Sequence, residues 1–328
     1  MRIVMIGEAG QHQGELVEHL SAPHDITTLP AQAASDPAYD ADLDGADVVI
    51  SLRLTRPEDR WPPFGLLHVP GAGLDGIALA QLPETVAVCN VYEHEIPIAE
   101  FVMSSLLEWE IDAPRDRAAF TDATWSALYR DRRPHGELHG RTMTLIGLGR
   151  VGRAIAARAA AFGIRILAVD DYADRATTPD HVTLVDSDQL TTALRAGDYV
   201  VLACPLTDET RGLLDGRTLS SLRPRSVLIN VSRAEIVDED ALFAVLSEGR
   251  IGGAFLDVWY RYPQGVDDHV EPSHQPLLSL PNARCTPHIS AWTRQLPRRR
   301  YAFIADNLNR LADGRTLRNV VRSGSLTI

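Results

Sequence analysis

The sequence predicts an α/β protein with doubly wound parallel sheets, and three observations indicate this class. Short apolar runs alternate with helical patterns along most of the 328 residues. One of these runs enters a helix through a glycine-rich loop, and polar residues directly follow several of the others. Strands and helices that alternate in this way form parallel sheets covered by helices. The length is sufficient for two domains, each with its own core.

The first ninety residues read as a small α/β unit of their own. A helix is expected at 13–20, and strands are expected at 2–6, 26–29, 48–52, 66–69 and 86–90. A long helical pattern at 98–117 follows, which Pro114 interrupts. We expect this helix to carry the chain into a second unit.

The stretch 144–171 carries the strongest local signal. It reads as a strand, the loop GLGRVG at 147–152, an amphipathic helix, and a second strand that ends at Asp170. Gly147 permits a tight turn, Gly149 lets a pyrophosphate approach the backbone, and Gly152 lets helix and strand pack closely. The helix N-terminus offers N–H groups to the phosphates. Together these features predict a dinucleotide site.

An acidic pair at the end of the second strand bears on which dinucleotide binds. Asp170 follows the loop at the spacing where a carboxylate accepts hydrogen bonds from the ribose hydroxyls. A 2′-phosphate would be repelled there, and Asp171 follows instead of an arginine. We therefore expect NAD rather than NADP.

The alternation continues beyond residue 171. Helices are expected at 188–194, 216–221, 238–248 and 299–313, and strands are expected at 182–185, 199–203, 226–231, 251–258 and 283–286. Ligands of such sheets bind beyond the carboxyl ends of the strands. The residues found there are Cys204 and Pro205, Ser232 and Arg233, Asp257, and His288.

Composition narrows the class of protein further. The net charge of −12 argues against a nucleic-acid partner. The chain contains no lysine, which excludes Schiff-base chemistry and the lysine of a P-loop. Cys89, Cys204 and Cys285 lie far apart, which indicates a reducing compartment with neither a disulfide framework nor a metal site. No apolar run approaches the roughly 20 residues that cross a bilayer, so we expect no membrane partner and a cytoplasmic protein.

Several motifs, taken together, resemble one family. The segments GAGLDGI, IPIAEF, GLGRVG, CPLTDETRGLLD, INVSRAEIVDEDAL, GAFLDVW and LPNARCTPHIS are similar, in sequence order, to the blocks of the D-isomer-specific 2-hydroxyacid dehydrogenases. The resemblance implies two Rossmann-like or flavodoxin-like domains, with the nucleotide domain inserted in the catalytic domain. We accordingly expect a substrate-binding (catalytic) domain at 1–97 and 296–328, and an NAD-binding domain at 98–295.

The resemblance also implies two catalytic residues. Arg233 matches the arginine that binds a 2-oxo acid, because a planar guanidinium can hold both its carboxylate and its carbonyl oxygen. The same group stabilises the charge that develops on that oxygen. His288 matches the histidine that exchanges a proton with it. The implied reaction is hydride transfer between a nicotinamide and a small 2-hydroxy or 2-oxo acid.

Tyr262 departs from the family pattern. In the family's LDVFxxEP pattern, a glutamate that raises the pKa of the histidine lies five residues after the aspartate, whereas here Tyr262 lies five residues after Asp257. A neutral phenol can orient an imidazole, but it does not favour imidazolium as a carboxylate does. Three interpretations remain open. Tyr262 takes over the orientation; or Asp267, Asp268 or Glu271 replaces the glutamate; or hydroxyacid turnover is lost, leaving related chemistry such as formate oxidation, or NAD sensing without catalysis.

Further residues are expected to contact the cofactor or the substrate. The resemblance places Asp257 near the nicotinamide amide and implies cofactor contacts from Arg150, Val151, Cys204, Pro205, Thr210, Val231, Ser232 and Ser290. Ala72 and Gly73 match backbone donors to the substrate carboxylate, while His94 and Trp292 are candidates for the substrate pocket. For several of these positions an ordinary turn is the alternative.

Arg53 is a candidate of another kind. It ends an apolar strand of the first unit, where it could bind a second anionic group of the substrate or simply remain solvated. The resemblance finally implies a homodimer formed largely through the nucleotide domains.

Overall fold

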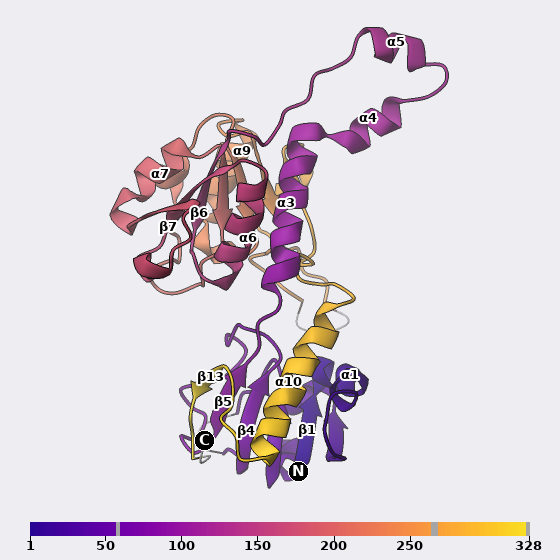
Figure 1. Ribbon diagram of the computed structural model, residues 1–328, viewed down its shortest axis with the longest axis vertical. Coiled ribbons are helices and arrows are strands. Elements are labelled where there is room, and N and C mark those ends of the chain that lie inside the picture. Colours follow the sequence, from indigo (N-terminus) through magenta and orange to yellow (C-terminus); the bar gives the residue numbers. More distant parts are fainter. Residues whose placement is uncertain (57–59, 264–267, 326–328) are drawn as a thin grey trace. The chain divides into compact units, whose positions relative to one another are not determined.

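The structure, a computed structural model, describes residues 1–56, 60–263 and 268–325. It divides into two compact units (Figure 1). One unit contains Met1–His94 and Thr293–Ile328, and the other contains Glu95–Trp292. The chain therefore enters and leaves the second unit slightly before residues 98 and 296, where the sequence placed the domain boundaries.

A six-stranded sheet, ordered β13-β5-β4-β3-β1-β2, forms the centre of the first unit. Its parallel strands are β1 (Arg2–Ile6), β2 (Asp25–Leu29), β3 (Ala46–Ile50), β4 (Phe64–Val69) and β5 (Ala87–Asn90). The inner strands are nearly continuous apolar runs because both of their faces are buried. β13 (Val320–Arg322) pairs antiparallel with β5, although the sequence predicted no strand there.

Helices cover one face of this sheet and shorter segments cover the other. On the first face lie α10 (Leu296–Ala312) and α1 (Gln13–Val17), which contribute Leu16, Ile304 and Leu308 to the core. On the second face, the core includes residues of η2 (Ala31–Ala34) and α2 (Asp40–Leu43). Two more 3-10 turns are η1 (Gly7–His12) and η3 (Pro37–Tyr39).

A seven-stranded parallel sheet, ordered β12-β11-β10-β9-β6-β7-β8, forms the centre of the second unit. Its strands are β6 (Thr142–Ile146), β7 (Arg165–Val169), β8 (Val182–Val185), β9 (Tyr199–Leu202), β10 (Val227–Asn230), β11 (Gly253–Leu256) and β12 (Ala283–Cys285). The strand order reverses between β6 and β9, where sheets of this kind bind ligands. The predicted class, α/β with doubly wound parallel sheets, is confirmed.

Both faces of the second sheet are covered by helices. On one face lie α3 (Glu95–Ile111) and α6 (Arg150–Ala161), which pack against each other. On the other lie α7 (Leu190–Ala196), α8 (Gly216–Leu219) and α9 (Glu239–Ser247). The 3-10 turns of this unit include η4 (Arg175–Thr177), η5 (Ser187–Gln189), η6 (Ala234–Ile236) and η7 (Leu277–Ser279). Within the part of the chain that the structure describes, no helix is long and apolar enough to cross a membrane.

The helix expected at 98–117 is in fact two helices. α3 ends because Asp112 adopts a left-handed backbone with a φ of 52°. Pro114 then lies in the first turn of α4 (Ala113–Ala119), where its missing N–H costs no hydrogen bond. α5 (Trp125–Arg130), which the sequence did not predict, follows. Residues 112–135, here called the arm, extend away from the rest of the second unit (Figure 1).

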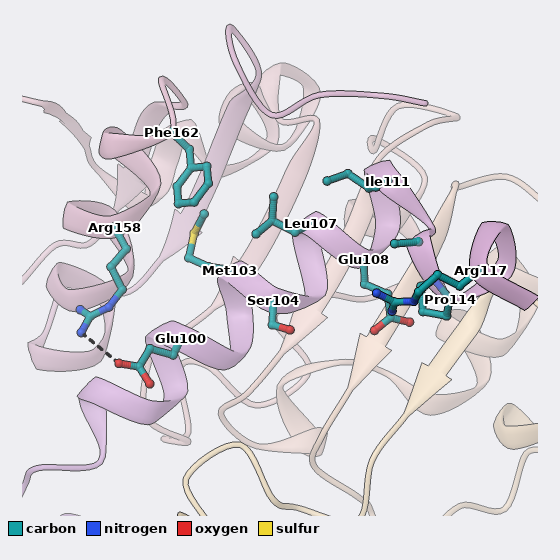
Figure 2. A pocket seen from close by; sticks show the side chains of 11 residues that line it. Glu100, Met103, Ser104, Leu107, Glu108, Ile111, Pro114, Arg117, Arg158 and Phe162 are labelled. Carbon is teal, nitrogen blue, oxygen red and sulfur yellow. Dashed lines mark ion pairs between the residues drawn. The ribbon is translucent and has the colours of Figure 1, made fainter. Parts of the chain in front are cut away.

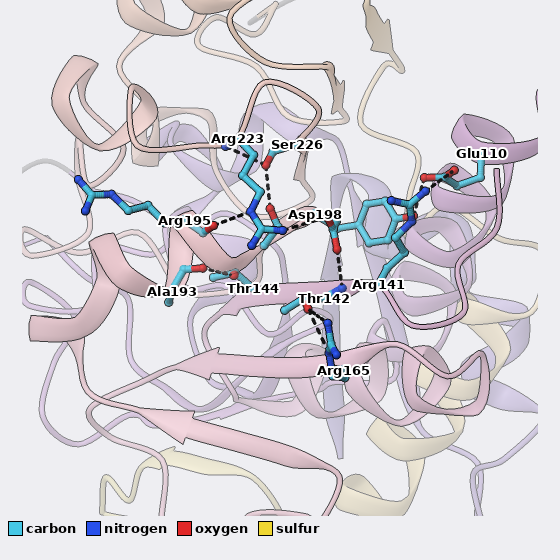
Figure 3. A network of polar contacts seen from close by, with 12 residues as sticks. Glu110, Arg141, Thr142, Thr144, Arg165, Ala193, Arg195, Asp198, Arg223 and Ser226 are labelled. Carbon is cyan, nitrogen blue, oxygen red and sulfur yellow. Dashed lines mark hydrogen bonds and ion pairs between the residues drawn. The ribbon is translucent and has the colours of Figure 1, made fainter.

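The base of the arm is fixed to a polar network at the amino ends of the strands (Figure 3). Gly136, where the arm returns, donates its N–H to the Glu110 carbonyl at 2.9 Å. A Cβ at Gly136 would lie 1.7 Å from the Glu110 carboxylate, so any other residue there would displace that carboxylate. That carboxylate accepts a hydrogen bond from the Tyr199 hydroxyl at 2.7 Å and forms an ion pair with Arg141 at 3.6 Å. These contacts fix the base of the arm to the rest of the second unit.

His68 makes the stability of the first unit depend on pH. Its ring is fully buried on β4, and Nε2 lies 3.1 Å from Asn307 Nδ2 of α10. Burial lowers the pKa of His68 from 6.5 to about 4. Between these values the unfolded chain binds the proton and the folded chain does not. We therefore expect this group alone to lower the free energy of unfolding by about 3 kcal/mol as the pH falls through that range.

The variant His68→Gln keeps an acceptor for Asn307 but does not titrate. Its stability relative to the wild type should therefore rise as the pH falls, in urea unfolding followed at neutral pH and near pH 4. His181→Gln, at an exposed histidine, is the control. A difference between wild type and His68→Gln that is the same at both pH values would contradict this account.

Candidate active site

The glycine-rich loop after β6 has the backbone geometry that its sequence predicts. Gly147 has a φ of +98°, and a Cβ there would lie 2.6 Å from the Cys204 nitrogen in the loop after β9. A Cβ on Gly152 would lie 2.1 Å from the Gly147 carbonyl oxygen, so glycine is needed for α6 to begin this close to β6. At Gly149, by contrast, a Cβ would have no atom within 4 Å. The loop is closed toward the protein and open at Gly149, where a pyrophosphate can approach.

Asp170, at the end of β7, holds this loop. Its Oδ2 accepts a hydrogen bond from Leu148 N at 2.6 Å, and its Oδ1 accepts two from the N–H groups of residues 172 and 173 at 2.8 and 3.0 Å. Carboxylate oxygens have further lone pairs, so Asp170 can still accept a ribose hydroxyl. Hydrogen bonds from Ser187 lower the pKa of Asp171 and keep a second negative charge beside it.

The loops after β9 and β10 are joined to each other. The Ser232 hydroxyl donates to the carbonyl of Cys204. Thr210 Oγ1 donates to the Pro205 carbonyl at 2.7 Å and accepts from Thr207 N at 2.8 Å. Thr210 therefore closes a turn in this structure, and its contact with a cofactor stays a prediction.

Arg233 is placed by the turn that follows β10. The buried amide of Asn230 accepts a hydrogen bond from Ser232 N at 3.0 Å and donates one to the Arg233 carbonyl at 2.9 Å. The guanidinium donates through NH1 to the Ser232 carbonyl at 2.9 Å. Val231 is buried in the same turn.

Asp257 follows β11 and is fully buried. Its Oδ1 accepts hydrogen bonds from the Thr286 hydroxyl at 2.6 Å and from Ile289 N at 2.8 Å, and its Oδ2 accepts one from Ser290 N at 2.9 Å. These donors lie on both sides of His288, which has a φ of +57°. Residues other than glycine rarely adopt this left-handed conformation.

Tyr262 is the hydrogen-bond partner of His288. Its hydroxyl lies 2.8 Å from His288 Nδ1 and accepts a hydrogen bond from Trp259 N at 3.1 Å. Burial raises the pKa of Tyr262, so the phenol stays neutral. Desolvation lowers the pKa of His288; the charge of Asp257 opposes this shift and that of Arg233 adds to it. The charges of Asp257 and Arg233 thus act on His288 with opposite signs.

The acids considered as substitutes for the family's glutamate are placed differently. Asp267 lies outside the described residues, while Asp268 and Glu271 are exposed. The turn beyond them is fixed by Glu239 of α9, whose Oε1 accepts hydrogen bonds from the backbone and side chain of residues 273–275.

Three substrate candidates lie together at the carboxyl edge of the first unit's sheet. Arg53 follows β3, and Ala72 and Gly73 follow β4. Leu54 N donates to the Gly76 carbonyl at 2.9 Å, which joins the two segments. A Cβ at Gly76 would lie 2.9 Å from Arg53 Cγ. Arg53 is therefore a close neighbour of the loop that contains Ala72 and Gly73.

The remaining candidates are more scattered. Arg150 and Val151 begin α6, and Ser290 is buried. His94 is the last residue of the first unit's N-terminal segment, and Trp292, 69% exposed, is the last residue of the second unit.

Three supporting residues were not among the sequence candidates: Asn230, Trp259 and Thr286. Trp259 Nε1 donates to the Thr286 carbonyl at 2.9 Å, which ties the end of β11 to the segment before His288. Each of the three lies at or just beyond a strand end, the same signal that singled out Arg233. Their chemistry alone did not distinguish them from ordinary packing residues.

The chain matches known proteins over most of its length. Residues 104–290 match the family model for the D-isomer specific 2-hydroxyacid dehydrogenase, NAD binding domain. The chain is 30% identical over 254 residues to the D-3-phosphoglycerate dehydrogenase of Methanocaldococcus jannaschii, which covers 76% of this chain and 46% of that protein. It is 31% identical over 231 residues to the hydroxypyruvate reductase of Thermotoga maritima, which covers 70% of this chain and 71% of that protein.

Solved structures share the fold. The structure of a D-isomer specific 2-hydroxyacid dehydrogenase family protein from Aeromonas salmonicida has a TM-score of 0.74 at 23% identity, with 98% of each chain covered. The chain spans about half the length of the phosphoglycerate dehydrogenases that it matches. Since the family model covers more than half of the sequence, the chain belongs to the D-isomer specific 2-hydroxyacid dehydrogenase family.

Proposed function

We propose that the protein is an NAD-dependent oxidoreductase that transfers hydride between the nicotinamide and a small 2-hydroxy or 2-oxo acid. The observation that carries this proposal is the position of Arg233 and His288 at the sheet edge that also holds the glycine-rich loop. Family membership supports it. We also infer a cytoplasmic setting, which the three free cysteines support.

The nucleotide edge of the second unit fits NAD. No side chain caps the start of α6, which begins beside the open position at Gly149, so a pyrophosphate can approach the helix N-terminus there. Asp170 and Asp171 place two carboxylates where NADP would carry its 2′-phosphate, which favours NAD. When bound, the nicotinamide supplies or accepts the hydride.

The chain's own residues bind the acid and move the proton. Arg233 holds the substrate carboxylate and stabilises the charge on the 2-oxo oxygen. His288 gives a proton to that oxygen in reduction and removes it in oxidation, while Tyr262 orients the imidazole. We further propose that the substrate also contacts Ala72, Gly73, His94 and Trp292, and that Arg53 binds a second anionic group where the substrate has one.

Formate oxidation is a second candidate, which the neutral partner of His288 favours. Formate gives up its hydride and becomes carbon dioxide without losing a hydroxyl proton. A histidine with a lowered pKa is therefore no obstacle to this reaction. A protein that binds NADH but turns over neither kind of substrate would instead be an NAD sensor.

A screen of 2-oxo acids tests both the substrate class and the role of Arg233. In an NADH-oxidation screen, we expect turnover of at least one acid among glyoxylate, pyruvate, hydroxypyruvate, oxaloacetate and phosphonopyruvate. For that acid, kcat/KM should fall roughly 1000-fold in Arg233→Gln, because the charge on the oxygen loses its stabilising partner. Arg250→Gln, at an exposed arginine paired with Glu248, is the matched control.

Two results, from this screen and from a parallel assay of NAD⁺ reduction by formate, would change the proposal. If the protein oxidises formate with NAD⁺ and turns over none of the 2-oxo acids, the second candidate is favoured. Binding of NADH without turnover of any of these compounds would refute both enzymatic proposals. A preference for oxaloacetate or phosphonopyruvate over pyruvate would support the role of Arg53.

The pH dependence of turnover tests the role of Tyr262. In Tyr262→Glu a carboxylate replaces the phenol, so the pKa of His288 should rise. The limb of the pH–rate profile that reports this histidine should therefore shift to higher pH by about one pH unit or more. Tyr262→Phe removes only the hydroxyl and should lower kcat without moving the limb upward. If the limb stays in place in Tyr262→Glu, Tyr262 does not govern the protonation of His288.

We also propose a homodimer formed through the second unit. The arm exposes a cluster of aromatic side chains whose neighbouring ring centroids are 5.8 and 5.0 Å apart: Phe120, Trp125 and Tyr129. A groove runs along α3 beside the base of the arm (Figure 2). Its floor is largely apolar, with Met103, Leu107, Ile111 and Phe162, and its lining also includes charged residues: Glu100, Glu108, Arg117 and Arg158. Exposed apolar surface of this kind marks a protein contact. We infer that the arm of one copy lies in the groove of the other.

Sedimentation equilibrium tests this assembly. We expect the wild type to be a dimer, and both Trp125→Asp in the arm and Leu107→Asp in the groove to be monomers, because each places a charge in the contact. Leu278→Asp changes an exposed apolar residue outside the arm and should remain dimeric. A monomeric wild type, or dimers in both interface variants, would refute the proposal.

A further inference from the structure

We infer that Asp257 is a positioning residue for His288. Its buried carboxylate binds the Thr286 side chain before the histidine and the backbone after it, and so imposes the left-handed conformation from which the imidazole reaches Tyr262. This inference rests on the proposed function only in taking His288 as the group that moves the proton.

The hydrogen bonds of Asp257 to residues on both sides of His288 are here called the clamp. On one side of His288, the Thr286 hydroxyl donates to Oδ1 at 2.6 Å. On the other side, the N–H groups of Ile289 and Ser290 donate to Oδ1 and Oδ2 at 2.8 and 2.9 Å. A fully buried carboxylate is costly unless such donors satisfy it, and hydrogen bonds to a charged acceptor are the strong ones. The clamp therefore constrains the segment strongly.

The segment between these contacts needs that constraint. His288 has a φ of +57°, which a residue with a Cβ adopts only when its surroundings impose it. The segment before it is held as well, since Thr286 N donates to the Leu256 carbonyl at 3.0 Å and the Thr286 carbonyl accepts from Trp259 Nε1 at 2.9 Å. After His288, the bonds to Asp257 hold the first two residues. Without them the backbone can relax to negative φ, and the ring turns away from Tyr262.

The charge of Asp257 also acts directly on the protonation of His288. It raises the pKa of His288 against the desolvation that lowers it. Asp257 thus supplies, through the backbone and through space, part of what a carboxylate at position 262 would supply directly.

Asp257→Asn tests the clamp, because it keeps the shape of the side chain but removes the charge and turns one acceptor into a donor that faces N–H groups. In the protein without substrate, we expect amide hydrogen exchange at Ile289 and Ser290 to become faster. In turnover of the best 2-oxo acid, we expect kcat to fall by about 100-fold, the cost of a misplaced catalytic group.

Two variants complete the comparison. Thr286→Val removes only the hydroxyl bond to Asp257 and should give a smaller change of the same kind; it also serves if Asp257→Asn does not fold. Asp215→Asn is the control, because Asp215 makes similar bonds to Thr218 N at 2.7 Å and Thr218 Oγ1 at 2.8 Å at the start of α8. It should lower the melting temperature without changing kcat or the exchange of residues 289 and 290.

The outcomes separate this inference from the proposed function. Unchanged exchange at Ile289 and Ser290 in Asp257→Asn would overturn the inference even if kcat fell, since the loss would then come from a cofactor contact. Faster exchange with wild-type kcat would overturn it as well. If the wild type reduces no 2-oxo acid, the proposed function fails, and the exchange measurement still decides whether Asp257 holds the His288 segment.

Discussion

The parallel pairing of the second unit's strands is the constraint on which its candidate site depends. β6 pairs with β7 through Ile146 and Val169 and with β9 through Ile146 and Leu202, so the three strands end level with one another. The glycine-rich loop can therefore contact both neighbours at once, through Asp170 on one side and through Cys204 on the other. A slip of one residue in either pairing would break one of these contacts and turn every side chain of that strand to the opposite face.

The sequence alone was sufficient to predict those features whose signal lies in a few neighbouring residues. The glycine loop, the strands at 2–6 and 182–185, and the strand ends that carry Arg233 and His288 all have such signals. It was insufficient where a conformation depends on distant contacts. The left-handed break at Asp112 separates α3 from α4, and β13 exists only because β5 offers an edge. Likewise, the donors that surround Asp257 lie about 30 residues further along the chain, so no local pattern connects them.

The exchange of a carboxylate for a phenol changes how His288 is supported. A hydroxyl can donate to a neutral imidazole and accept from a protonated one, so Tyr262 serves both protonation states, whereas a carboxylate favours only the charged one. Tyr262 therefore orients the imidazole, while the more distant charges of Asp257 and Arg233 shift the pKa of His288. In the family's pattern one glutamate governs both the position and the protonation of the histidine, whereas in this chain several residues share these two tasks.

Asp170 links the choice of cofactor to the architecture of the loop. A substitution that removed its repulsion of a 2′-phosphate would also remove at least one of the two oxygens that accept from Leu148 N and from the turn at 172 and 173. A mutational route toward NADP must therefore pass through an intermediate with a weakened loop, unless a second change comes first. Selection on loop integrity would act on the same aspartate that repels a 2′-phosphate, so folding and cofactor preference constrain a single side chain.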